Sequence, residues 1–249
     1  YMQTFRATIK TILFTASTLG LYFFWFITHY FVPNKIHWRQ SIFYWWTLSF
    51  ARISAMRLEI IGKPPKPPFF LVCNHLSIVD MSALRVAAKG VFVAKSEVNG
   101  WPVAGRIIRD MGTVFIDRQN RRDIPRAGEE IIKRLDDGEG VIVFPEGTST
   151  KGETVLPFNS SFLQFAAVKN IPVSYASISY QTPPGDMPAN QAICWWEDIS
   201  FFEHLWRIFK QREYNAVINF GNEPIMRSDR KELANELRDR VAETFVPLL

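Results

Sequence analysis

The chain has 249 residues, 47% of them hydrophobic, which is enough for one α/β domain with a full core and an additional segment. Its formal net charge of +5 suits an anionic lipid surface or nucleic acid, but an aromatic content of 14%, including 8 tryptophans, favours a membrane interface. The two cysteines, Cys73 and Cys194, lie far apart and lack metal-ligand spacing, so neither a disulfide framework nor a zinc site is expected.

The N-terminal part is rich in uncharged and aromatic residues. Residues 11–34 contain no Asp, Glu, Lys or Arg, and the stretch is long enough to span a bilayer as a helix. It lacks the small-residue cleavage site of a signal peptide. Residues 40–51 form a second uncharged stretch that is too short to span, and its aromatic density favours a helix at the level of the lipid headgroups.

Three arrangements of this N-terminal part are open. The first stretch spans the bilayer beside an interfacial helix, or the two stretches form a helical hairpin that dips into one leaflet, or both pack onto the domain as core helices. The third arrangement is disfavoured because the indole N–H groups of four tryptophans would then need buried partners. These tryptophans are Trp25, Trp38, Trp45 and Trp46.

A stiff, basic connector at residues 62–68 marks the expected boundary between a membrane-associated segment, 1–61, and an α/β domain, 62–249. After it, strand-like and helical patterns alternate, which indicates a mixed, largely parallel sheet flanked by helices. The expected strands are 69–73, 91–94, 114–116, 141–144, 173–179 and 216–220. The expected helices are 78–89, 103–111, 124–137, 160–169 and 230–245.

The first of these strands leads into a motif that can carry chemistry. It ends at Asn74 and His75, and Ser77-Ile-Val-Asp80 then has the pattern of a helix N-terminus. A strand-to-helix turn allows the Asp80 carboxylate to return to the His75 imidazole, although five positions along one helix would separate them. The pair would be a base with its orienting carboxylate. In a plainer interpretation, Asp80 only caps the helix and His75 is an ordinary turn histidine.

A second apolar run, 141–144, is broken abruptly by Pro145-Glu-Gly-Thr148. With the first motif it belongs to an ordered set of blocks that resembles the glycerolipid acyltransferases, most of all the 1-acylglycerol-3-phosphate acyltransferases. The resemblance covers residues 60–225. The blocks are Asn74-His75-x4-Asp80, Gly-Thr-Val-Phe-Ile-Asp-Arg at 112–118, Phe-Pro-Glu-Gly-Thr at 144–148, Leu156-Pro-Phe158 and Ile171-Pro172.

This resemblance implies a glycerol-3-phosphate acyltransferase-like α/β fold with an N-terminal two-helix membrane-binding motif. It also implies transfer of a fatty acyl group from acyl-coenzyme A or acyl carrier protein to the free sn-2 hydroxyl of 1-acylglycerol-3-phosphate, which makes phosphatidic acid. The expected location is a membrane, on the cytoplasmic face of the bacterial inner membrane. No metal, no cofactor besides the acyl co-substrate and no nucleic-acid partner are expected.

The resemblance also assigns roles to residues. His75 would take the proton from the acceptor hydroxyl and Asp80 would hold the imidazole, as in a Ser-His-Asp triad without the enzyme serine, so no acyl-enzyme is expected. Arg118, whose planar guanidinium suits a phosphate, and Lys95 are the expected phosphate contacts. The remaining expected substrate-binding residues lie in the second block: Glu146, Gly147, whose N–H is a candidate oxyanion donor, Thr148 and Ser149.

The second block departs from the family pattern, which usually continues with Arg-Ser where this chain has Ser149-Thr150. Either Lys151 replaces the arginine, or the acceptor head group is not a simple phosphomonoester, as in family members that act on lyso-ornithine lipid. Two other classes stay open. One is a metal-dependent hydrolase with His75, Asp80 and Glu146 as ligands, and the other is a non-catalytic membrane-remodelling protein.

Residues 200–210 form a late aromatic segment with basic neighbours. Its apolar side chains recur at helical spacing, which fits an interfacial helix beside the site and equally a core-packed amphipathic helix. These side chains are Phe201, Phe202, Leu205, Trp206 and Phe209. His204, within the segment, is expected to be structural.

Overall fold

The computed structural model describes residues 1–117, 120 and 122–248. Its centre is a seven-stranded sheet in the order β1-β7-β6-β2-β5-β3-β4, in which β6 and β7 are antiparallel and every other neighbouring pair is parallel. The strands are β1 (Met56–Ile61), β2 (Phe69–Cys73), β3 (Gly90–Lys95), β4 (Val114–Ile116), β5 (Gly140–Val143), β6 (Val173–Gln181) and β7 (Tyr214–Phe220). The predicted mixed, largely parallel sheet is therefore confirmed.

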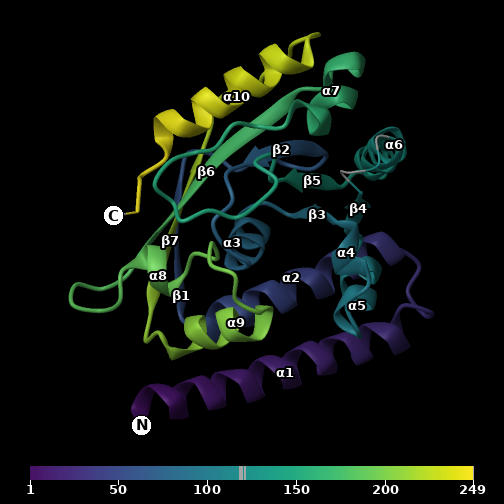
Figure 1. Cartoon of the computed structure of the whole chain (residues 1–249). Helices are drawn as coiled ribbons and strands as arrows, with labels where there is room; N and C mark the ends of the chain where they lie inside the picture. Colours follow the sequence, from purple (N-terminus) through teal and green to yellow (C-terminus); the bar gives the residue numbers. More distant parts are fainter. Residues whose placement is uncertain (118–119, 121, 249) are drawn as a thin grey trace.

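The helices occupy the connections between the strands and both faces of the sheet. They are α1 (Met2–Thr28), α2 (Lys35–Ser54), α3 (Val79–Ala87), α4 (Ser96–Asn99), α5 (Ala104–Asp110), α6 (Asp123–Asp136), the 3-10 helix η1 (Ser160–Leu163), α7 (Gln164–Lys169), α8 (Ala189–Ala192), α9 (Phe201–Lys210) and α10 (Arg230–Thr244). The layers are visible in Figure 1: α7 and α10 cover one face of the sheet, and α3 covers the other face, with α2 beneath it and α1 outermost.

The two central strands are apolar because both faces of the sheet are covered. All five residues of β2 and all four of β5 are buried, as expected for parallel strands between helical layers. Leu71 lies opposite Ile142 across the β2–β5 pair, and Cys73 lies opposite Ala176 across the β2–β6 pair. Since parallel strands end at the same edge of a sheet, the segments after β2, β3, β4 and β5 meet there.

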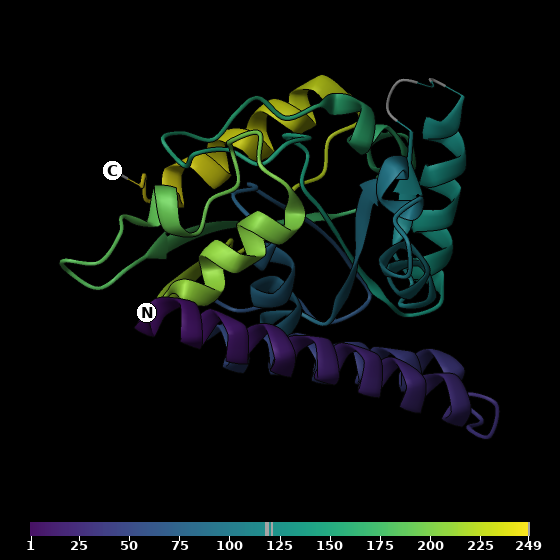
Figure 2. The same cartoon turned by 60° about the horizontal axis from the view of Figure 1, so that its bottom comes forward.

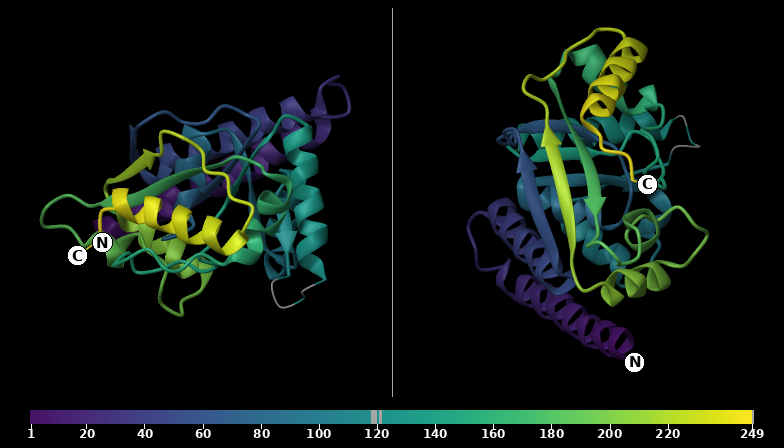
Figure 3. Two further views of the ribbon diagram at one scale, coloured as in Figure 1. Left: turned by 90° about the horizontal axis from the view of Figure 1, so that it is seen from above. Right: turned by 90° about the vertical axis from the view of Figure 1, so that its left-hand side faces the viewer.

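The N-terminal helices lie side by side along the molecule, away from α10 (Figures 2 and 3). On α2, Ile42, Phe43 and Phe50 belong to the core cluster, so this helix packs onto the domain. Two of its indole N–H groups are satisfied by α1: Trp38 donates to Thr28 and Trp46 donates to Thr18, each at 2.9 Å. The core-packed arrangement, disfavoured on the ground of tryptophan N–H groups, therefore holds for α2.

Helix α1 is different, because it turns an apolar face outward. Within the described residues it is the one helix long and apolar enough to cross a membrane, judged by length and composition, and none of its most apolar window is buried. Its exposed apolar side chains include Phe5, Ile9, Ile12, Leu13, Leu19, Phe23, Phe24 and Ile27. The two N-terminal helices are thus present as predicted, and α1 packs on α2.

The sequence patterns locate every strand except β1. That strand carries Arg57 and Glu59 at alternate positions and lies at the edge of the sheet, where most of its side chains stay exposed. It therefore lacks the buried apolar run by which the other strands are predicted. Because β1 pairs with β7 in parallel, it belongs to the sheet, although the domain boundary predicted after residue 61 assigns it to the N-terminal segment.

Candidate active site

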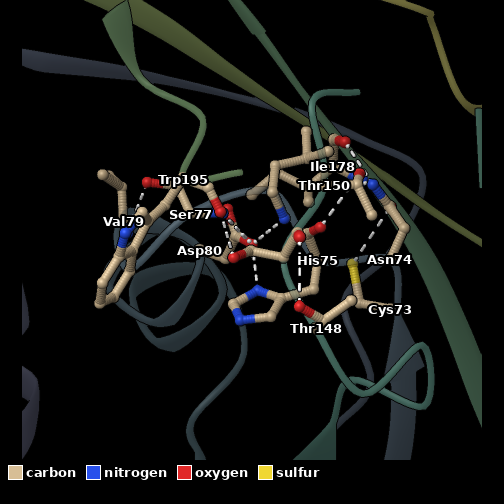
Figure 4. A network of polar contacts seen from close by, with 12 residues as sticks. Cys73, Asn74, His75, Ser77, Val79, Asp80, Thr148, Thr150, Ile178 and Trp195 are labelled. Atoms are coloured by element: carbon tan, nitrogen blue, oxygen red, sulfur yellow. Dashed lines mark hydrogen bonds and ion pairs between the residues drawn. The ribbon is translucent and has the colours of Figure 1, made fainter. Parts of the chain in front are cut away.

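The turn between β2 and α3 is built around the carboxylate of Asp80, which is fully buried. Its Oδ2 accepts hydrogen bonds from His75 Nδ1 at 2.7 Å, from the Leu76 backbone N–H at 2.7 Å and from the Ser77 backbone N–H at 3.0 Å (Figure 4). The last two bonds are the capping role that the sequence allowed for Asp80. One carboxylate therefore binds two backbone N–H groups ahead of α3 and also holds the imidazole, so Asp80 does more than satisfy the start of a helix.

The same geometry determines the tautomer of His75. Because an aspartate oxygen that receives backbone N–H bonds acts as an acceptor, the His75 Nδ1 carries the proton and Nε2 keeps its lone pair. No described residue forms a hydrogen bond with Nε2. The ring stacks on Phe144 with a centroid distance of 4.2 Å, and 24% of the side chain is exposed. His75 thus presents a proton acceptor on a ring whose orientation is held from two sides.

Two residues of β6 and one motif residue complete the support of this turn. The Tyr180 hydroxyl donates to the other Asp80 oxygen, Oδ1, at 2.5 Å. Asn74 binds the Ile178 backbone twice, donating from Nδ2 at 3.0 Å and accepting at Oδ1 at 2.8 Å. Burial is the main cause that raises the pKa of Tyr180 well above its usual range, so the phenol keeps its proton for this bond. Tyr180 was missed by the sequence patterns, because nothing in a strand sequence marks one tyrosine as a partner of a distant carboxylate.

Glu146 lies directly after β5, in the turn that was predicted to hold the acceptor. Burial, followed by the nearby charge of Asp80, raises its pKa from 4.5 to about 8, although the backbone groups of Leu156 and His75 lower it somewhat. Neither carboxylate oxygen has a hydrogen bond of ordinary geometry to a described residue. A buried carboxyl without such partners costs folding free energy. Because carboxyl groups with strongly raised pKa values cluster at functional sites, Glu146 is a candidate site residue.

The rest of the second block forms a tight turn beside Glu146. Gly147 has a φ of +81°, a backbone conformation that glycine adopts without strain, and its N–H donates to the Phe144 carbonyl at 3.1 Å. Thr148 is exposed. Ser149 Oγ donates to the backbone carbonyl of Trp195, so a residue predicted to bind substrate is engaged with a distant loop.

The two predicted phosphate contacts have different outcomes. Lys95 is exposed at the end of β3, on the edge of the sheet where β2 and β5 also end, and none of its contacts joins it to His75 or Glu146. Arg118 lies outside the described residues. Lys151, considered as a replacement for the missing arginine, pairs with Glu153 at 2.9 Å and lies over the Trp196 ring at 5.3 Å.

A segment far along the chain closes over the turn from the other side. The Trp195 backbone N–H donates to the Leu76 carbonyl at 2.8 Å, and His204 Nε2 lies 3.1 Å from Ser77 Oγ. His204 sits on α9, whose Leu205, Ile208 and Phe209 are also buried, whereas Phe202 is 79% exposed. The late aromatic segment is therefore a helix that packs one face into the core and exposes another.

The hydrolase alternative requires three side chains close enough to hold one ion. Within residues 1–117, 120 and 122–248 no group of three or more His, Cys, Asp or Glu side chains has that arrangement. His75, Asp80 and Glu146 do not form such a group. The contacts between His75 and Asp80 instead resemble the base and orienting carboxylate of an acyl-transfer triad.

Three comparisons place the chain among known proteins. A family model described as Acyltransferase matches residues 57–179. The chain is 30% identical over 225 residues to a lyso-ornithine lipid O-acyltransferase of Brucella abortus, covering 85% of this chain and 84% of the relative. It is 30% identical over 163 residues to a 1-acyl-sn-glycerol-3-phosphate acyltransferase of Neisseria gonorrhoeae, covering 64% of this chain and 63% of the relative.

A solved structure supports the fold. The 1-acyl-sn-glycerophosphate acyltransferase PlsC of Thermotoga maritima superposes with a TM-score of 0.72 over 97% of this chain and 95% of its own, at 22% sequence identity. The α/β architecture with its N-terminal helices is therefore shared. This likeness concerns the fold alone, so it does not identify the acceptor of this chain.

Proposed function

Since the chain belongs to the acyltransferase family, we propose that it moves a fatty acyl group from acyl-coenzyme A or acyl carrier protein to a free hydroxyl of a lysolipid. The observation that carries the proposal is the His75–Asp80 pair, in which Nδ1 is bound to the carboxylate and Nε2 is left as the acceptor. A base held in one tautomer by a buried carboxylate suits proton removal from an alcohol.

In the proposed reaction, His75 Nε2 takes the proton of the acceptor hydroxyl while the oxygen of that hydroxyl attacks the thioester carbonyl carbon. The tetrahedral intermediate then expels the thiolate, and the imidazolium returns the proton to that sulfur. Asp80 stabilises the imidazolium during the step. No acyl-enzyme is proposed, because Ser77 Oγ lies against His204 and the Cys73 thiol is buried against Asn74.

Glu146 is proposed to bind the acceptor. At neutral pH a carboxyl whose pKa is about 8 is largely protonated, so it can donate one hydrogen bond and accept others. A polyol or amide of a lysolipid offers both kinds of partner. Thr148, Lys95 and Arg118 keep their predicted roles in head-group binding as parts of this proposal. The Gly147 N–H, which donates to the Phe144 carbonyl, would have to leave that bond to serve as an oxyanion donor.

The proposed site of action is a membrane surface, on the cytoplasmic face of the bacterial inner membrane. The outward apolar face of α1 supports the membrane surface, since Phe5, Ile12 and Phe23 are each more than half exposed; the side of the membrane is taken from the family resemblance. Exposed aromatic and aliphatic side chains in such a row favour burial in a bilayer interface. A lysolipid acceptor and a long-chain product would then stay in the lipid phase.

For the acceptor we favour lyso-ornithine lipid, which the sequence analysis placed second. Ser149 and Lys151, the two residues able to replace the missing arginine, are bound to Trp195 and Glu153 respectively. In this arrangement Ser149 Oγ is not free for a phosphomonoester, and Lys151 would have to leave its exposed ion pair with Glu153. The lyso-ornithine relative also matches more of the chain, 85%, than the Neisseria relative, 64%. Lysophosphatidic acid remains the second candidate because the latter relative carries that activity in its name.

Thiol release from palmitoyl-coenzyme A tests the proposal directly. The detergent-purified protein is assayed with lyso-ornithine lipid, with lysophosphatidic acid and without acceptor, and then with palmitoyl-acyl carrier protein as donor. His75→Ala should abolish release, whereas His37→Ala, the same change at an exposed position of α2, should not.

The arms of this assay separate the acceptors. Release only with lyso-ornithine lipid supports the preferred acceptor, and release only with lysophosphatidic acid makes that phospholipid the acceptor instead. If no acceptor and donor combination gives thiol release, or if His75→Ala keeps full activity, the proposed function is refuted.

A further inference from the structure

The N–H groups that hold Asp80 are themselves anchored by a distant segment. Leu76 N–H and Ser77 N–H both donate to Asp80 Oδ2. Leu76 is tied through its carbonyl to the Trp195 N–H at 2.8 Å. Ser77 is tied through Oγ to His204 Nε2 at 3.1 Å. The carboxylate that orients His75 therefore depends on two residues more than 100 positions away in the chain.

His204 is fully buried and has a definite hydrogen-bonding state. Its Nδ1 has no partner among the described residues. Leaving a buried N–H donor unpaired is the less acceptable choice, so Nε2 carries the hydrogen and donates it to Ser77 Oγ, while Nδ1 keeps only a lone pair. The ring stacks on the Trp195 indole at 5.1 Å with an interplanar angle of 14°.

His204 also stays uncharged at working pH. Burial, followed by the charge of Arg207, lowers its pKa to about 4. A neutral imidazole with one hydrogen on Nε2 is a fixed donor rather than a titrating switch. The serine hydroxyl that receives this hydrogen bond also lies 3.4 Å from the Val79 N–H at the start of α3, so it joins the α9 contact to the first turn of α3.

We propose that His204 is a positioning residue for acyl transfer, which acts through Ser77 by holding the Ser77 N–H in line with Asp80 Oδ2. This inference rests on the proposed function, because its consequence is the orientation of the base His75. It differs from a purely structural role, in which His204 would only fill space between α9 and α3. In that case its loss would lower stability without changing the catalytic turn.

The position of α9 gives this contact a further meaning. Phe209, one turn after His204, packs on Phe14 of α1 at a centroid distance of 5.8 Å, and Arg6 of α1 donates to the Lys210 carbonyl at 2.9 Å. The helix that contacts the catalytic turn on one side thus contacts the outward-facing helix α1 on the other.

Four variants separate a positioning role from a structural one. His204→Leu removes the donor, and His204→Gln restores an amide N–H near the position of Nε2. Ser77→Ala removes the hydroxyl that receives the bond but leaves the backbone N–H to Asp80. Ile131→Ala, on the buried face of α6, which packs on β4, β5 and α7, is the control for lost stability alone.

The kinetic readout is the separation of kcat from KM. His204→Leu should lower kcat about 10-fold to 100-fold with little change in KM, by analogy with the loss seen when the hydrogen-bond partner of a metal-ligating histidine is removed. His204→Gln should recover most of the loss. The double variant His204→Leu/Ser77→Ala should be no slower than the slower single variant, because both changes break one interaction. Ile131→Ala should have a lower Tm than the wild type but the same kcat at a temperature where the variant is folded.

A spectroscopic readout decides the matter even if no acceptor is turned over. The chain has 4 histidines, so selective ¹⁵N-histidine labelling resolves the His75 Nδ1–H proton in the bond to Asp80, assigned with His75→Ala. His204→Leu and Ser77→Ala should shift or broaden this signal, and Ile131→Ala should not. An unchanged signal and an unchanged kcat in folded His204→Leu would overturn the positioning role. If the wild type releases no thiol with any acceptor but the His75 Nδ1–H signal still shifts in His204→Leu, the proposed function is refuted and the positioning role stands.

Discussion

Replacing Glu146 by Gln should stabilise the protein, and the gain should grow as the pH rises. The folded state raises the pKa of this carboxyl from 4.5 to about 8, chiefly by burial and then by the charge of Asp80. Between these two pH values the folded protein holds a proton that the unfolded chain has released. Stability of the wild type therefore falls with rising pH across this window. A glutamine has the same shape and no proton to lose.

The magnitude follows from the same pKa. Each pH unit in the window costs the wild type about 1.4 kcal/mol, so the whole shift corresponds to about 5 kcal/mol of unfolding free energy. This contribution is fully present below pH 4.5 and is lost as the pH passes 8. The figure is an upper bound, because water that enters the deprotonated site lessens the cost of burial. Above pH 8 the stability difference between Glu146→Gln and wild type should be constant.

The assay is denaturant unfolding in detergent at pH 5, 6, 7, 8 and 9, followed by tryptophan fluorescence, for wild type and Glu146→Gln side by side. The difference between the two midpoints should widen from pH 5 to pH 8 and then level off. Glu153→Gln, at an exposed carboxylate in the same loop, serves as the matched control and should show no such widening. A difference that is flat with pH, or that narrows, would refute the reasoning that Glu146 is a buried acid.

Three further outcomes are expected. Tyr180→Phe removes one donor to the buried Asp80 carboxylate, which should cost about 1.5 to 3 kcal/mol of stability and lower kcat more than it changes KM; an unchanged denaturation midpoint would show that the bond is not formed. Gly140→Ala would drive a Cβ into the Phe69 ring, and this overpacking should lower the free energy of unfolding by about 1 to 3 kcal/mol, measured by thermal unfolding. Phe23→Asp, on the exposed face of α1, should reduce sedimentation with liposomes without lowering Tm, and binding equal to wild type would argue against α1 as the membrane surface.

Much of the fold could be predicted from local patterns. The runs at 69–73 and 141–144 are apolar throughout because parallel strands are covered on both faces. The Ser77-x-x-Asp80 pattern predicted the start of α3, and the structure shows the helix beginning at Val79 with the Ser77 N–H donating to the Asp80 carboxylate. Strand β1 was not predicted, because an exposed edge strand needs no run of buried apolar residues. The packing of α2 onto the domain was not predicted, because the indole N–H groups of Trp38 and Trp46 find their partners on a separate helix, α1.

The local sequence alone determined the pair at the centre of the site, because His75 and Asp80 are five positions apart and a strand-to-helix turn suffices to join them. Only the tertiary structure decided what holds that pair. Tyr180 comes from β6, which lies beside β2 in the sheet. His204 lies on α9, 127 positions beyond Ser77 in the chain. Hydrogen bonds between such distant residues leave no periodicity or spacing in a sequence, since their geometry is set by strand order and helix packing.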